Sequence, residues 1–144
     1  MAQVLLAAIV GLMAVGIGMT FYVGSELKQF LSRVPQLRSQ EDLDEYRRMA
    51  GRQMYAALIQ IVVLGTPFIL FMYGVFKGYF NCIHVLLYLA LNGALFMVSM
   101  MIKQIELQVR QLPAANEAIA AERDRIVHVW RTKALPDWKA DRGV

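Results

Sequence analysis

Charged side chains are absent from three long stretches of this chain, Ala2–Gly24, Gln53–Phe76 and Tyr79–Ile102. Of all 144 residues, 18% are charged and 58% are hydrophobic, and the mean hydropathy is +0.44. A composition this apolar excludes an ordinary soluble domain of the same size. We therefore expect a protein that lies in a lipid bilayer.

The chain is also poor in the residues that chemistry needs. Cys82 is its one cysteine, so no disulfide can form within the chain, and no CxxC or CxxCH spacing exists for metal, redox or haem attachment. No HExxH motif, phosphate-binding glycine loop or cluster of Ser, His and acidic residues occurs. We expect no enzymatic activity, no catalytic residues, no cofactor and no metal site.

Each charge-free stretch is long enough to cross a membrane as a helix. A helix needs roughly 20 apolar residues to span about 30 Å of hydrocarbon, and all three stretches exceed that length. Backbone polar groups must pair within each segment, because the bilayer core contains no water. The sequence predicts an all-α fold with three transmembrane helices in residues 1–112, followed by a tail in residues 113–144.

Basic residues predict the orientation of these helices. Fourteen of the fifteen lysines and arginines lie in two segments, Ser25–Arg52 and Lys103–Val144, and only Lys77 lies between the second and third spans. The positive-inside rule then places both segments in the cytoplasm and the N-terminus outside, in what we expect to be a bacterial inner membrane. Because topology accounts for the net charge of +4, we expect no nucleic-acid partner.

The second and third helices are expected to form a long antiparallel hairpin that extends into the cytoplasm. Ser39, followed by Glu41 and Asp42, has the pattern of a helix start, and Lys77–Asn81 has the pattern of a tight turn. Between them, Pro67 predicts a kink in the second helix. Because the helix starts near Ser39 and the charge-free stretch starts at Gln53, about a third of the second helix is expected to lie outside the bilayer.

An apolar seam continues the third helix beyond the membrane. Ile105, Val109 and Leu112 keep three- and four-residue spacing among polar neighbours, so they need a partner to cover them. One partner is a second subunit. The other is the projecting start of the second helix, which offers Leu43, Tyr46, Met49, Ala50 and Met54.

A last helix is expected in the cytoplasmic tail at about 116–134. Asn116 is a suitable N-cap, and Pro136 follows the end of the pattern. Its apolar side, which includes Trp130, is expected to pack on the hairpin or on a neighbouring subunit. Adsorption to the membrane surface is the alternative, because Trp130 and Trp138 lie beside basic residues.

Four small residues form the best-specified interaction surface in the sequence. Ala7, Gly11, Ala14 and Gly18 step by four, three and four, which gives the first span a smooth stripe that another helix backbone can approach closely. The spacing does not distinguish packing within the chain from packing between chains.

Uncharged polar residues are the deepest polar groups in the spans. Gln60 and Asn92 lie at depths that allow a hydrogen bond across the hairpin, worth about 0.6–2 kcal/mol in lipid. Alternatively, Gln60, Thr66 and Asn92 line a pore between repeated copies of the chain. Amides without charge provide no proton relay, so the structural role is favoured.

His84 is the one histidine near the bilayer. It shares a helix face with Asn81 and Tyr88, which fits a hydrogen-bonded interfacial histidine. A haem ligand is the alternative, although Cys82 points to roughly the opposite face and cannot chelate with it.

Together these features predict a non-enzymatic membrane subunit that acts as an accessory or scaffolding part of a larger assembly, homo- or hetero-oligomeric. A homo-oligomeric channel or holin-like pore is the first alternative, and a haem-binding anchor of an electron-transfer complex is the second. The arrangement is similar in outline to three-span stator proteins of ion-driven motors and to three-span phage holins. No motif carries either likeness, so we assign neither family.

Overall fold

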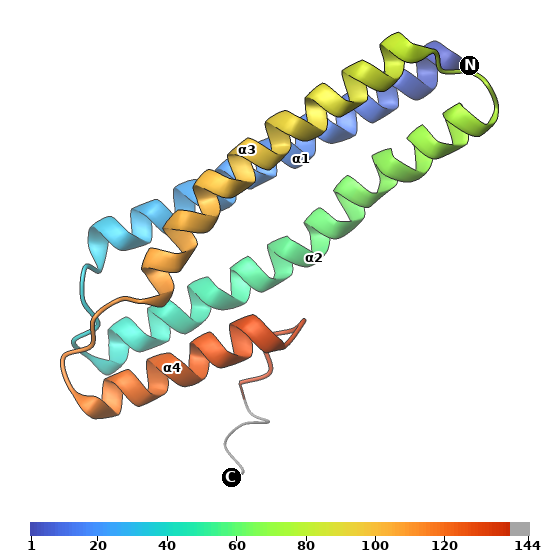
Figure 1. The fold of residues 1–144 in the computed structure, drawn as a ribbon. Coiled ribbons are helices and arrows are strands. Elements are labelled where there is room, and N and C mark those ends of the chain that lie inside the picture. The colour runs from blue at the N-terminus through green and yellow to red at the C-terminus, as the bar shows by residue number, and fades with distance from the viewer. Residues whose placement is uncertain (139–144) are drawn as a thin grey trace. The chain divides into compact units, whose positions relative to one another are not determined.

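A computed structural model describes residues 1–138 of the chain and confirms the all-α fold class. Lys139 and Arg142, counted above among the basic tail residues, lie outside the described residues. Three of the four helices are long and apolar enough to cross a membrane. The helices, labelled in Figure 1, are α1 (Ala2–Arg33), α2 (Gln40–Phe76), α3 (Cys82–Arg110) and α4 (Glu117–Thr132).

The chain divides into two compact units, and α1, α2 and α3 each contribute to both. Unit 1 comprises Met1–Tyr22 and Ile59–Lys103, and unit 2 comprises Val23–Leu58 and Gln104–Val144. Unit 1 therefore contains nearly all of the charge-free sequence, whereas unit 2 contains nearly all of the charges.

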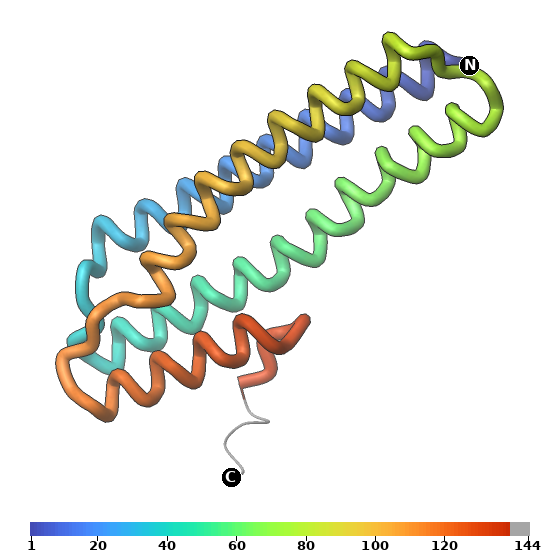
Figure 2. Tube along the Cα trace, in the orientation of Figure 1, coloured from blue at the N-terminus to red at the C-terminus, as the bar shows by residue number. Residues whose placement is uncertain are grey.

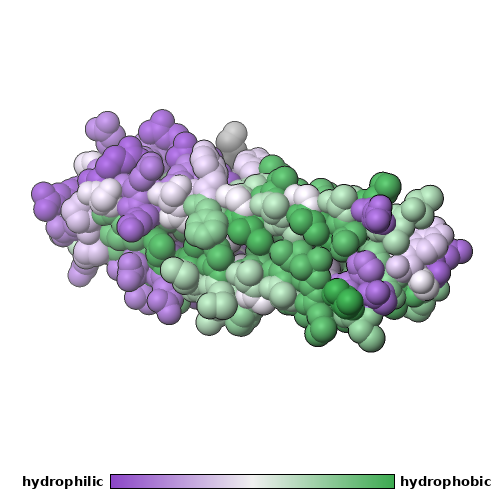
Figure 3. All heavy atoms as spheres, turned by 90° about the horizontal axis from the view of Figure 1, so that it is seen from above, coloured by the Kyte–Doolittle hydropathy of each residue, from purple (hydrophilic) through white to green (hydrophobic). Residues whose placement is uncertain are grey.

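Unit 1 buries little of its apolar surface. In the most hydrophobic window of each spanning helix, 28% of α1, 11% of α2 and none of α3 is buried. Over unit 1, the face seen in Figure 3 is a nearly continuous green surface of hydrophobic side chains. Since exposure of this much apolar surface to water is unfavourable, this unit is suited to contact with lipid.

Unit 2 has the largest hydrophobic core of the described chain. All four helices contribute to it, because α1 does not end at the membrane boundary expected near Gly24 but continues as helix to Arg33. The extension buries Leu27 and Phe30, and Val34, just after the helix, is buried as well. The segment Ser25–Arg52 is thus mostly helical, and only residues 34–39 link α1 to α2.

The two links of unit 2 are tied together by backbone hydrogen bonds. Leu37 donates to the carbonyl of Pro113 at 2.9 Å, and Ala115 donates to the carbonyl of Leu37 at 2.9 Å. The side chain of Leu37 is completely buried. The α1–α2 link and the α3–α4 link therefore run side by side, as Figure 2 allows the reader to follow.

The start of α2 is a capping box. Ser39 Oγ accepts a hydrogen bond from the Asp42 N–H at 3.2 Å, and Asp42 Oδ2 accepts from the backbone N–H groups of Arg38 and Ser39 at 2.8 and 3.1 Å. The hydrogen bond from Arg38 is the main reason that the pKa of Asp42 lies below its usual value. The helix start expected at Ser39 is therefore present in the structure.

The end of α2 requires Gly78. Tyr79 N–H donates to the Gly74 carbonyl and Gly78 N–H donates to the Val75 carbonyl, which together make a Schellman motif. Gly78 has φ of +70°, a conformation that costs residues with a side chain about 1–2 kcal/mol. Upstream, α2 continues through the buried Pro67.

Asp42→Asn tests the capping box at the start of α2. A lowered pKa in the folded state means that the carboxylate contributes stability above about pH 4, and that this contribution is lost as pH falls through the folded-state pKa. We expect the variant to be less stable at pH 7 and to lose less stability on acidification. Denaturant unfolding at several pH values measures both effects. Asp44→Asn removes the same charge outside the cap, and an identical pH profile for the two variants would contradict the assignment.

Gly78→Ala tests the turn after α2. Because the native φ is positive, we expect a loss of about 1 kcal/mol in the free energy of unfolding. Gly93→Ala is the matched control, since a Cβ there meets open space and the residue is helical. Thermal unfolding in detergent compares the two, and equal melting temperatures would argue against the strained turn.

Candidate functional site

The small-residue stripe of α1 lies on the outer surface of unit 1. Ala7, Gly11, Ala14 and Gly18 are all exposed, and a Cβ built on Gly11 or Gly18 has no atom within 4 Å. The described part of the chain therefore leaves the stripe uncovered.

A different face of α1 packs inside unit 1. Leu5, Ile9, Met13 and Thr20 are buried on this face. Gly16 lies on it too, and a Cβ at this position would overlap the Leu64 side chain. A helix with two such faces can pack on its own chain and still present the stripe outward.

Gln60 is paired within unit 1, and its partner is on α1. Its Nε2 donates to Thr20 Oγ1 at 2.8 Å, and the Thr20 hydroxyl donates in turn to the Gly16 carbonyl at 2.8 Å. The hydrogen bond considered between Gln60 and Asn92 is not the one that the structure has. Thr20, which no sequence pattern singled out, is the residue that satisfies the amide.

Thr66 and Asn92 bond to their own helices. Thr66 Oγ1 donates to the Val62 carbonyl at 2.8 Å, and Asn92 Nδ2 donates to the Tyr88 carbonyl at 2.8 Å. These are local hydrogen bonds that a polar side chain makes when no other partner is near. The three candidate pore residues are therefore not brought together within unit 1.

His84 belongs to the start of α3. Asn81 Oδ1 accepts from the His84 N–H at 3.3 Å, and His84 Nδ1 lies 3.2 Å from the Asn81 N–H and 2.6 Å from Asn81 Oδ1. The imidazole also stacks on Phe80, with ring centroids 5.3 Å apart. This arrangement is a capping box with histidine in its third position.

The apolar seam of Ile105, Val109 and Leu112 lies in the core of unit 2. Val109 and Leu112 are buried and Ile105 is half-buried. The Tyr46 hydroxyl donates to the Val109 carbonyl at 3.2 Å, and burial raises the pKa of the Tyr46 phenol. Each residue that the sequence offered as a partner on α2 is buried too: Leu43, Tyr46, Met49, Ala50 and Met54.

Trp130 closes this core from α4. It is 9% exposed, lies edge-on to Tyr46 with centroids 6.4 Å apart, and carries the Arg110 guanidinium 4.6 Å above its ring. Arg110 also pairs with Glu106 on its own helix. Because Trp130 is part of the core, it is not available to anchor α4 on a membrane surface.

One ion pair, between Arg47 and Glu122, joins α2 to α4, and each of its members has a second partner on its own helix. Arg47 joins Asp44 at 2.9 Å and Glu122 at 2.6 Å, while Arg125 joins Glu122 at 3.3 Å. Arg47, Glu122 and Arg125 border an open depression of about 410 Å³, together with Gln40 and Ala118. The three charged groups are paired with one another, so the depression offers no unpaired charge for a ligand.

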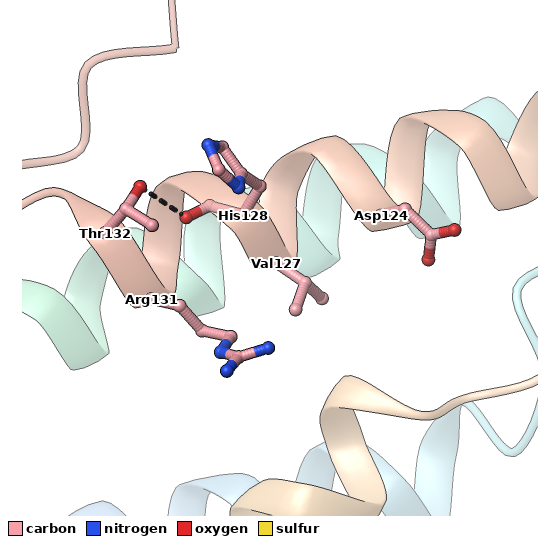
Figure 4. Close-up of a pocket in the computed structure, with 5 residues that line it drawn as sticks. All are labelled: Asp124, Val127, His128, Arg131 and Thr132. Atoms are coloured by element: carbon pink, nitrogen blue, oxygen red, sulfur yellow. Dashed lines mark hydrogen bonds between the residues drawn. The ribbon is translucent and has the colours of Figure 1, made fainter.

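A second open depression, of about 520 Å³, lies along α4. Asp124, Val127, His128, Arg131 and Thr132 line it. Figure 4 shows the His128 ring and the Asp124 carboxylate pointing away from each other, and the Thr132 hydroxyl donating to the His128 carbonyl at 2.7 Å. No acid, base and nucleophile converge there, as a catalytic site requires.

Residues 1–138 contain no group of three or more His, Cys, Asp and Glu side chains that could hold a metal ion. No protein family profile, no curated protein and no solved structure matches the chain.

Trp130→Ala tests the core of unit 2. Removing a buried indole leaves a cavity and is expected to lower the free energy of unfolding by about 3–5 kcal/mol. Leu135→Ala, at a side chain that is 54% exposed, should change it by less than about 0.5 kcal/mol. Denaturant unfolding followed by circular dichroism measures the difference. A small effect for Trp130→Ala would contradict its place in the core.

Proposed function

We propose that this chain is a non-enzymatic subunit that joins other membrane helices in a larger assembly through the stripe on α1. One observation carries the proposal: Gly11 and Gly18 are open to their surroundings, while Gly16 on the same helix packs on Leu64. The chain thus uses one face of α1 for itself and leaves the smooth face free.

A stripe of this kind stabilises helix contacts in lipid by close approach. Lipid tails are as apolar as side chains, so burial alone gives little association between membrane helices. Small residues allow two backbones to come near each other, which increases van der Waals contact. The partner is therefore expected to be a helix within the bilayer, from a second copy of this chain or from a different subunit.

The proposed location is a bacterial inner membrane, with the N-terminus outside and unit 2 in the cytoplasm. Fourteen basic residues in Ser25–Arg52 and Lys103–Val144 support this orientation through the positive-inside rule. Unit 2, with its own buried core and ion pairs, suits an aqueous compartment.

A pore is less well supported than a packing role. Gln60, Thr66 and Asn92 each donate to a partner within unit 1, so lining a channel would require these bonds to be exchanged for water. Ion flux into liposomes that is lost in Gln60→Leu and Asn92→Leu, with assembly intact, would favour the pore instead.

Gly11→Leu combined with Gly18→Leu tests the packing role. Both positions face open space, so we expect the variant to insert and fold normally but to lose its partner helix. Native gels and cross-linking of the gently extracted protein should show a lower assembled mass. The mass also distinguishes a homo-oligomer from a complex with other chains.

Gly16→Leu is the matched control on the same helix. Its side chain meets Leu64, so we expect a lower melting temperature of the chain. An unchanged assembled mass in the Gly11 and Gly18 variant would refute the stripe as an interface between chains.

A further inference from the structure

Several basic side chains gather where α1 and α2 pass from unit 2 into their charge-free stretches. Arg52 is the last charged residue before the stretch that begins at Gln53, and Arg48 lies one turn earlier on the same face of α2. Glu26 of α1 lies at the same level, because it bonds to Arg52 Nε at 2.8 Å and to Gln53 Nε2 at 3.1 Å. Lys28 follows Glu26 by two residues, so it lies at nearly the same level on roughly the opposite face of α1.

The end of α4 comes to this level of α2 as well, which the sequence did not indicate. A Cβ built on Gly51 lies 3.7 Å from Pro136 and 3.9 Å from the Trp138 ring. Arg125 holds this segment by donating to the Trp138 carbonyl at 2.9 Å. Arg131 lies in the last turn of α4, two residues before Lys133. Lys133 precedes Pro136 by three residues, so its backbone lies within about 11 Å of Pro136.

We call this set the basic rim of unit 2, and its charges are mostly unpaired. Within residues 1–138, Arg52 pairs with Glu26, and the other members of the rim have no ion pair. The acidic groups near these residues are Glu26, which bonds to Arg52 and Gln53, and Asp137, which has a partner of its own. The members of the rim are all exposed: Lys28, Arg48, Arg52, Arg131 and Lys133.

Two aromatic side chains accompany the basic rim. Tyr55 follows Arg52 by three residues on α2 and is 53% exposed, and Trp138 is half-buried beside Gly51. Tyrosine and tryptophan are enriched at the headgroup level of membranes, where an apolar ring and a polar tip are both accommodated. Aromatic groups beside exposed cations are thus suited to the lipid interface.

We propose that the basic rim of unit 2 binds the headgroups of anionic phospholipids. The rim lies where charged sequence gives way to charge-free helix, which is the level at which headgroups surround a spanning protein. Phosphate groups of anionic lipids supply the negative partners that these exposed arginines and lysines do not find within residues 1–138. Arg48 and Arg52 are one helical turn apart on α2, so both can face the same headgroup layer. The proposal depends on membrane insertion, and does not depend on the stripe of α1.

Arg48→Gln combined with Arg52→Gln tests the rim. Protein in mild detergent is titrated with phosphatidylglycerol or phosphatidylcholine at low ionic strength, and bound lipid is counted by native mass spectrometry. Each basic residue near an anionic surface contributes about fivefold, so we expect the variant to bind phosphatidylglycerol about thirty-fold more weakly. Phosphatidylcholine binding should be unchanged, and the wild-type preference should decrease as salt is added.

Arg38→Gln combined with Lys77→Gln removes the same charge away from the rim and should leave the lipid preference intact. Arg131→Gln combined with Lys133→Gln provides a second rim variant and leaves the Arg52–Glu26 pair in place. Circular dichroism checks that each variant folds.

Equal binding of the two lipids by the wild-type protein would overturn the proposal, and so would equal loss in the rim and control variants. Glycerol 3-phosphate that binds as tightly as phosphatidylglycerol would assign the rim to a free phosphate compound. A polyglutamate peptide that outcompetes phosphatidylglycerol would assign it to an acidic protein. Loss of assembly without a change in lipid preference would bear on the proposed role of the α1 stripe and would leave lipid binding by the rim supported.

Discussion

Tyr46 of α2 lies at the centre of the core of unit 2, because it contacts all three other helices of that unit. Its ring centroid lies 5.9 Å from Phe30 on α1 and 6.4 Å from Trp130 on α4, and its hydroxyl bonds the Val109 carbonyl of α3. A fully buried phenol needs a hydrogen-bond partner, and the Val109 carbonyl, which also accepts from the Leu112 N–H at 3.3 Å, uses its second lone pair for the Tyr46 hydroxyl. The contacts of this one side chain bring the four helices to a common centre.

The two units differ in where their apolar side chains lie. Unit 2 buries its apolar side chains against one another, as in a water-soluble helical bundle, and pairs charges such as Arg47 and Glu122 on its surface. Unit 1 leaves most apolar side chains outward and satisfies its polar groups internally, as Gln60 and Thr20 do. This difference follows the distribution of charge along the sequence, since a side chain facing lipid cannot carry charge at low cost.

Much of the fold could be predicted, because it depends on local patterns. Caps at Ser39 and Asn116 and a glycine after α2 are present where the sequence indicates them. The continuation of α1 to Arg33 was missed, although Leu27 and Phe30 have helical spacing. Those residues follow the apolar stretch and stand among charges, and only a partner core explains why they remain helical.

The sequence by itself determined three helices long and apolar enough to span a membrane, the charged segments that flank them and the residue types of each surface, since these depend on composition and local spacing. The tertiary structure determined which side chains and helix faces contact one another. It joined Gln60 to Thr20 instead of Asn92, turned the stripe of Ala7, Gly11, Ala14 and Gly18 outward, and placed Trp130 in a core. A periodic pattern states that a helix has an apolar, small or polar face, but which face meets which helix depends on packing between residues far apart in the chain.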